Sequence, residues 1–171
     1  MTKEELLLLF DKNHRKIIEY VCALNDAQFI YSSNNKWTAG QQLNHIYLTL
    51  LPFPKLLPAK EYILQKYGKI DRPTWSFETV IQNYYKTSRK APEQFLPDVI
   101  TPDQKNAIAK NIQGILVEIE SLLEQYSEEE LDTLIIPHPL LGRLTIREMF
   151  YLMSYHPLHH LRQVEEYFEN I

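Results

Sequence analysis

Apolar side chains recur at three- and four-residue steps along most of this chain, which is the period of a helix with one buried face. Such stripes run over residues 2–26 and from residue 145 nearly to residue 171. The clearest one, between residue 102 and about residue 126, consists of Ile108, Ile112, Ile115, Leu116, Ile119, Leu122, Leu123 and Tyr126. No segment shows the alternation of a half-buried strand, so the pattern predicts an all-α fold.

A repeated signal marks where these helices begin. In a capping box, a Ser or Thr is followed three residues later by Glu or Gln, and each side chain accepts a hydrogen bond from the other's backbone N–H. Four of the matching sites open long stretches with helical periodicity, and the fifth predicts one short turn of helix. The five pairs are Thr2 with Glu5, Thr38 with Gln41, Thr101 with Gln104, Ser127 with Glu130, and Thr145 with Glu148.

Prolines limit the helix that starts at residue 38. Pro52, Pro54 and Pro58 fall in its later part. A proline inside a helix removes a backbone donor and clashes with the preceding turn. We therefore expect this helix to kink or stop near Leu51 and a new helix to run from about residue 60 to 66.

The remaining segments predict one further helix and several connections. Residues 76–89 carry an apolar side and predict a helix, whereas residues 26–36 are polar and residues 91–100 hold two prolines. Residues 135–142 are expected to be extended, because each proline there pushes its predecessor out of the helical region. The whole pattern predicts one domain over residues 1–171, a four-helix bundle with long connections.

Composition narrows the classes of partner and compartment. The 171 residues are 44% hydrophobic and 23% charged, with a net charge of -4, as in ordinary globular proteins. Basic residues are scattered among acidic ones, so we expect no nucleic-acid binding. We find neither a signal peptide nor a run near the about 20 apolar residues of a membrane span, and expect a cytoplasmic protein. The single cysteine, Cys22, excludes an internal disulfide and a cysteine-based zinc cluster.

Two histidines interrupt the apolar face of the last predicted helix. His156 and His160 lie in the same stripe as Met149, Met153 and Val164. Residues four apart are separated by about 40° around the helix axis and about 6 Å along it, so both imidazoles can converge on one ion. Helices hold zinc with histidine pairs at this spacing. The spacing leaves open two alternatives, a hydrogen-bonded core pair and a surface cluster.

A secure metal site needs a third ligand from another helix. His14 is flanked by basic residues, and we expect it to be solvated. His138 lies between two prolines in a loop. His45 lies two turns into the helix that starts at residue 38, and spacing favours it as the third ligand.

Three segments resemble the DinB/YfiT-like superfamily, which is named after a bacterial DNA-damage-inducible protein. They are Trp37-Thr-Ala-Gly-Gln-Gln-Leu-Asn-His45, His138-Pro-Leu-Leu-Gly-Arg-Leu-Thr-Ile-Arg-Glu148 and Tyr155-His-Pro-Leu-His-His-Leu-Arg-Gln163. The resemblance covers nearly the whole chain in element order. It implies a four-helix bundle with a three-histidine site for zinc, nickel or a similar ion. The ligands of that site correspond to His45, His156 and His160.

Residues around the expected site add detail. Pro157 lies inside the last predicted helix, between the expected ligands His156 and His160. We expect this proline to bend the helix and to change the angle between the two imidazoles. His159 is rotated by about 100° from His160, so a flanking or second-layer role is favoured. Gln163 lies three residues beyond His160 and is a candidate to orient a ligand or a bound water, although an edge position without a role fits it as well.

Three histidines leave a coordination position open, as in catalytic rather than structural zinc sites. An all-imidazole set suits zinc or nickel and excludes magnesium and calcium. The resemblance implies two activities, transfer to a low-molecular-weight thiol or metal-dependent hydrolysis. Hydrolysis needs a general acid or base, and no convincing one lies near the histidines in sequence, which favours the thiol route. Metal or partner binding without turnover is the third hypothesis.

Expected partners are few. The substrate of either activity is a small molecule. The aromatic-rich segment at residues 75–85 offers surface for a homodimer.

Overall fold

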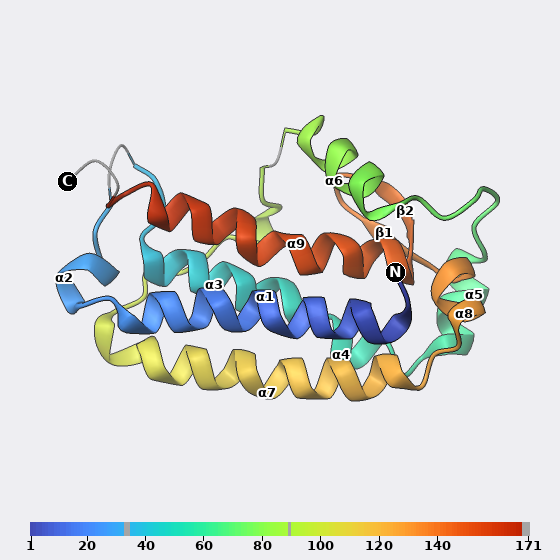
Figure 1. The fold of residues 1–171 in the computed structure, drawn as a ribbon, viewed down its shortest axis with the longest axis horizontal. Helices are drawn as coiled ribbons and strands as arrows, with labels where there is room; N and C mark the ends of the chain where they lie inside the picture. The colour runs from blue at the N-terminus through green and yellow to red at the C-terminus, as the bar shows by residue number, and fades with distance from the viewer. Residues whose placement is uncertain (33–34, 89, 169–171) are drawn as a thin grey trace.

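The computed structural model describes residues 1–32, 35–88 and 90–168. Within them, four long helices pack against one another (Figure 1). Two of these helices run in one direction and two in the other, and the all-α prediction is confirmed for this body of the molecule. The four are α1 (Lys3–Ala23), α3 (Ala39–Leu50), α7 (Lys105–Glu124) and α9 (Ile146–Glu165).

Shorter elements connect the long helices. The described connections contain five short helices, two 3₁₀ turns and one hairpin. The helices are α2 (Asp26–Phe29), α4 (Phe53–Leu56), α5 (Lys60–Tyr67), α6 (Phe77–Tyr85) and α8 (Glu128–Thr133). The 3₁₀ turns span Glu93–Phe95 and Pro102–Gln104, and the hairpin consists of β1 (Ile135–His138) and β2 (Gly142–Thr145).

The helix starts follow the local sequence. All five predicted capping boxes are present, which confirms them as start signals. A sixth box, Asn25 with Gln28, ends the first helix earlier than predicted and opens α2. The expected polar connection at residues 26–36 therefore begins with a helical turn. Asparagine is as good an N-cap as serine, so the signal was present in the sequence.

Prolines shape the chain after α3 as predicted. The helix stops at Leu50, α4 starts after Pro52, and α5 begins at Lys60. Gly68 ends α5 with a φ of 77°, a conformation that glycine adopts without a Cβ clash.

The hairpin corrects the prediction that the chain contains no strand. β1 and β2 are antiparallel, with Ile135 opposite Thr145 and His138 opposite Gly142. Both strands are edges of a two-stranded ribbon, where a proline such as Pro137 is tolerated because its missing N–H breaks no central ladder. Each strand has only four residues, which is too few for an alternation of apolar and polar side chains to stand out in the sequence. The hairpin leads straight into α9 through the Thr145 cap.

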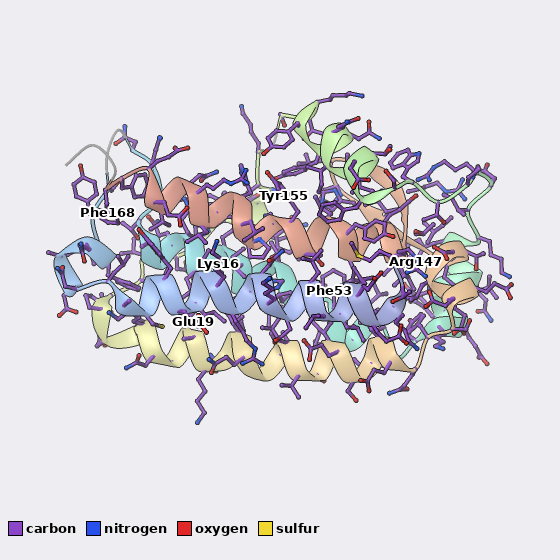
Figure 2. All side chains as sticks on the ribbon, in the orientation of Figure 1. Lys16, Glu19, Phe53, Arg147, Tyr155 and Phe168 are labelled. Carbon is purple, nitrogen blue, oxygen red and sulfur yellow. The ribbon has the colours of Figure 1, made fainter. Side chains whose placement is uncertain are left out.

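Apolar side chains fill the space between the long helices (Figure 2). The ring of Phe10 on α1 meets that of Phe150 on α9 edge-on, with ring centroids 5.3 Å apart, and the ring of Phe53 also packs against Phe150, with centroids 4.9 Å apart. Gly40 lets the first turn of α3 approach α2, since a Cβ there would lie 2.7 Å from the ring of Phe29. No helix in the described part of the chain combines the length and apolarity that crossing a membrane requires.

Candidate metal centre

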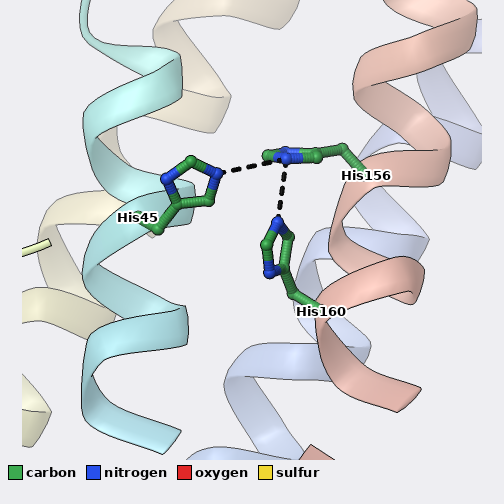
Figure 3. Close-up of side chains that lie close together, drawn as sticks. All are labelled: His45, His156 and His160. Atoms are coloured by element: carbon green, nitrogen blue, oxygen red, sulfur yellow. Dashed lines mark hydrogen bonds between the residues drawn. The ribbon is translucent and has the colours of Figure 1, made fainter. Parts of the chain in front are cut away.

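Three buried histidines converge between α3 and α9 (Figure 3). The Nε2 atom of His156 lies 3.3 Å from Nε2 of His45 and 2.9 Å from Nε2 of His160. The three histidine residues are between 4% and 8% exposed. The structure thus brings together the three residues that the sequence and the family resemblance indicated.

Two of the rings are held by hydrogen bonds through their other nitrogen. Nδ1 of His45 donates to the carbonyl oxygen of Phe95 at 2.6 Å. Nδ1 of His160 donates to Oε1 of Gln42 at 2.5 Å. Because carbonyl oxygens only accept hydrogen bonds, both Nδ1 atoms carry the proton. In the neutral rings Nε2 is then a bare lone pair, and both lone pairs face His156.

The arrangement fits a cation better than it fits a proton. Nε2 of His156 can donate to only one of the two lone pairs that face it. With the proton on Nδ1 instead, three lone pairs would face one another. A metal ion satisfies all three at once, and ligands at the 2.0–2.1 Å typical of zinc–imidazole bonds lie about 3.3 Å apart in a tetrahedral site.

Burial keeps these rings in the form that binds metals. Burial lowers the pKa of His45, although the hydrogen bond to Phe95 opposes this shift. Burial, and then repulsion by the neighbouring histidines, holds the pKa of His156 and of His160 well below the usual value of 6.5. The rings are therefore neutral at neutral pH, and only the neutral imidazole offers a lone pair to a metal.

Pro157 lies inside α9, and the helix continues through it to Glu165. Its ring deprives the carbonyl of Met153 of its usual partner. The flanking His156 and His160 still face one point, with ring centroids 4.4 Å apart.

Gln42 is a residue of the site that sequence analysis missed. It donates from Nε2 to Oε1 of Gln163 at 2.9 Å while it accepts from His160. Gln163 in turn bonds to His159 at 2.8 Å. The expected second-layer residues, His159 and Gln163, thus join the cluster through Gln42. The signal for Gln42 was its place three residues before His45, which puts both on one helix face.

His14 and His138 stay outside the cluster. The prediction that His14 is solvated is wrong, since the side chain is 0% exposed and burial lowers its pKa to about 4. It belongs to the buried face of α1, and the basic residues around it in sequence point to solvent. His138 sits at the hairpin turn, where Nδ1 accepts from the N–H groups of Leu140 and Leu141. Its proton is therefore on Nε2.

A pocket of about 1090 Å³ opens onto the three histidines. Its wall is largely apolar and aromatic, with the Trp37 ring 5.0 Å from that of His45. Glu166 is the one carboxylate among the described residues that line it, and this side chain is exposed and 4.0 Å from the ammonium of Lys36. Lys90 and Arg162 also line the pocket, so its charged residues carry a net positive charge.

Glu148 has a structural role away from the pocket. It completes the capping box of Thr145, as predicted, and accepts two hydrogen bonds from the guanidinium of Arg72.

Comparison with known families places the histidines in context. The family model of the DinB superfamily matches residues 9–164, a range that contains all three histidines and the three similar segments. Among curated proteins, none matches the chain.

Proposed function

The chain belongs to the DinB superfamily, and from this premise we propose that His45, His156 and His160 bind a divalent metal ion, zinc or nickel. The observation that carries the proposal is the convergence of the Nε2 atoms of three buried, neutral histidines. In two of these rings the proton is on Nδ1 and is donated to Phe95 or Gln42, which leaves Nε2 free to bind a metal. Imidazole nitrogen suits zinc and nickel, whereas magnesium and calcium prefer oxygen ligands.

The site is proposed to be catalytic. Three protein ligands leave at least one position open, whereas structural zinc sites are closed by four. The pocket gives a small molecule access to that position, and its apolar wall excludes competing water.

We further propose that the substrate is a low-molecular-weight thiol, whose sulfur forms a bond to an electrophilic carbon. The leaving group departs from that carbon, and the thiol proton is released to solvent. A bound divalent metal would supply Lewis acidity, lowering the pKa of a coordinated thiol so that it reacts as thiolate. The lining residues support this route over hydrolysis, since Glu166 is the one described carboxylate there and is engaged with Lys36. A free thiol, with a pKa of about 8.5, is far more acidic than water, with a pKa of about 15.7, so the thiol ionises without the positioned base that hydrolysis usually uses.

The remaining lining residues bind and orient the reactants. Arg162 and Lys90 attract acidic groups on the thiol at the pocket mouth. Apolar side chains such as Phe53 and Met153 bind the electrophile.

Metal content is the first test. Protein purified without a histidine tag should contain about one zinc or nickel ion per chain by elemental analysis, and His45→Ala and His160→Ala variants should contain none. Loss in neither variant, or wild-type protein that takes up neither metal, would refute the proposal.

The reaction is tested next on the metal-loaded protein. The metal-loaded wild-type protein should conjugate glutathione with chlorodinitrobenzene at a higher rate than the His160→Ala variant does. Turnover of nitrophenyl esters without any conjugation would instead identify a hydrolase.

A further inference from the structure

Two buried nitrogen atoms near the junction of α1 and α9 lack hydrogen-bond partners in the described structure. They are Nε2 of His14 and Nδ1 of His156. One other buried side-chain atom in the described residues shares this property, Oε1 of Glu120. Buried polar atoms without partners are rare in folded proteins, so each of them calls for an explanation.

The two nitrogens are complementary as donor and acceptor. Nδ1 of His14 donates to the carbonyl oxygen of Phe10 at 2.7 Å, so it carries the proton and Nε2 is an acceptor. A histidine that binds a metal through Nε2 carries its proton on Nδ1, which makes Nδ1 of His156 a donor.

The helix packing places His14 and His156 at nearly the same height along the two helix axes. α1 and α9 run side by side in the same direction (Figure 1). Phe10 meets Phe150, and Nδ2 of Asn13 donates to the carbonyl of Ser154 at 2.8 Å, so facing residues differ in number by about 140. The same offset puts His14 opposite residues 154–155, which is about 1.5–3 Å along the axis from His156 at 1.5 Å per residue.

The other two proposed ligands show what His156 lacks. Nδ1 of His45 donates to Phe95 and Nδ1 of His160 donates to Gln42. Metal-binding histidines almost always donate their second N–H, because this fixes the ring orientation and raises the basicity of the ligand. His156 would be the exception unless an acceptor on the α1 side serves it.

We propose that His14 is the positioning residue for His156, accepting the Nδ1 proton of His156 through one buried water. This rests on the proposed metal site. A water between two such nitrogens satisfies both at once, as buried waters commonly do. His14 thereby holds the ring of His156 in the direction of its Nε2 neighbours without touching metal or substrate.

Zinc affinity tests the inference. Competition with a chromophoric chelator should give a tenfold or larger loss for His14→Phe relative to wild type. His14→Gln, whose amide oxygen can still accept, should recover part of that loss. The control Glu120→Gln alters the other unpartnered group, away from the site, and should bind zinc as wild type does.

The outcomes separate this inference from the metal proposal. Wild-type affinity in His14→Phe, with zinc bound by the wild type, would overturn the role of His14 and leave the metal site standing. A wild type that binds no zinc would overturn both.

Nuclear magnetic resonance keeps the test valid if His14→Phe fails to fold. Long-range proton–nitrogen spectra of zinc-loaded wild type should show His14 protonated at Nδ1 and a slowly exchanging Nδ1 proton on His156. A His14 ring protonated at Nε2 would overturn the inference.

Discussion

The two halves of α9 both bury polar side chains, but only in the first half do these side chains pair with opposite charges among the described residues. In the first half, Glu148 is fully buried and accepts from Arg72 and from the N–H of Trp75. Arg147, at the right-hand end of the bundle in Figure 2, is 4% exposed and pairs with Asp132. Every charge there has an opposite charge within the chain.

In the second half, His156 and His160 face His45 with no carboxylate in the group that the described residues form. Donors are scarce and lone pairs are in excess. The difference separates a structural polar cluster, which is complete in the folded chain, from the proposed ligand site, which a cation would complete.

Breaking the complete cluster should have the largest effect on stability. Arg72→Ala leaves the buried Glu148 carboxylate without its charge partner, and the expected loss is about 3–5 kcal/mol of unfolding free energy. Urea denaturation measures it. The matched control Arg143→Ala removes an exposed pair with Asp71 and should cost under about 1 kcal/mol. Equal losses in the two variants would contradict the comparison.

Filling the incomplete cluster should stabilise the protein. Zinc at about a hundredfold excess over its dissociation constant adds about 2.7 kcal/mol by mass action. The melting temperature of wild type should rise by several degrees, and that of His45→Ala should not. Arg72→Ala should melt lower but keep the zinc-induced rise, because its damage lies in the other half of α9. A rise in His45→Ala equal to that of wild type would contradict this.

Acid should lower the stability of the folded protein by protonating its buried histidines. Burial lowers the pKa of His14 and of His138 from 6.5 to about 4, so the unfolded chain binds more protons between these values. Stability of the metal-free protein is therefore present above pH 6.5 and is lost as pH falls toward 4. Each such histidine costs about 2 kcal/mol between pH 7 and pH 5. Urea denaturation at the two pH values should show this loss, and a flat profile would be inconsistent with neutral buried rings.

The smallest expected effect is on zinc affinity, from replacing the two glutamines near His160. Gln42 touches the ring directly, whereas Gln163 acts through Gln42. Gln42→Ala should lower zinc affinity about tenfold, and Gln163→Ala should lower it less. Chelator competition measures both. A larger effect of Gln163→Ala would mean that Gln163, rather than Gln42, orients the ligand.

Local signals in the sequence were sufficient for much of the fold. Capping boxes place helix starts at Thr38 and Thr145 because the two hydrogen bonds involved join residues only three apart. The pairing of His156 with His160 follows from helical geometry alone, since residues four apart share a face.

Only the tertiary structure decided what meets these elements from elsewhere in the chain. Phe95 is 50 residues from His45, and its carbonyl acts through backbone position, which no side-chain pattern reveals. His14 is buried because α9 covers that face of α1, although its neighbours in sequence are basic. Sequence by itself determined the helices and the histidine pair, because both depend on short-range geometry. Packing determined which atoms complete the site, because hydrogen bonds and burial depend on distance in space.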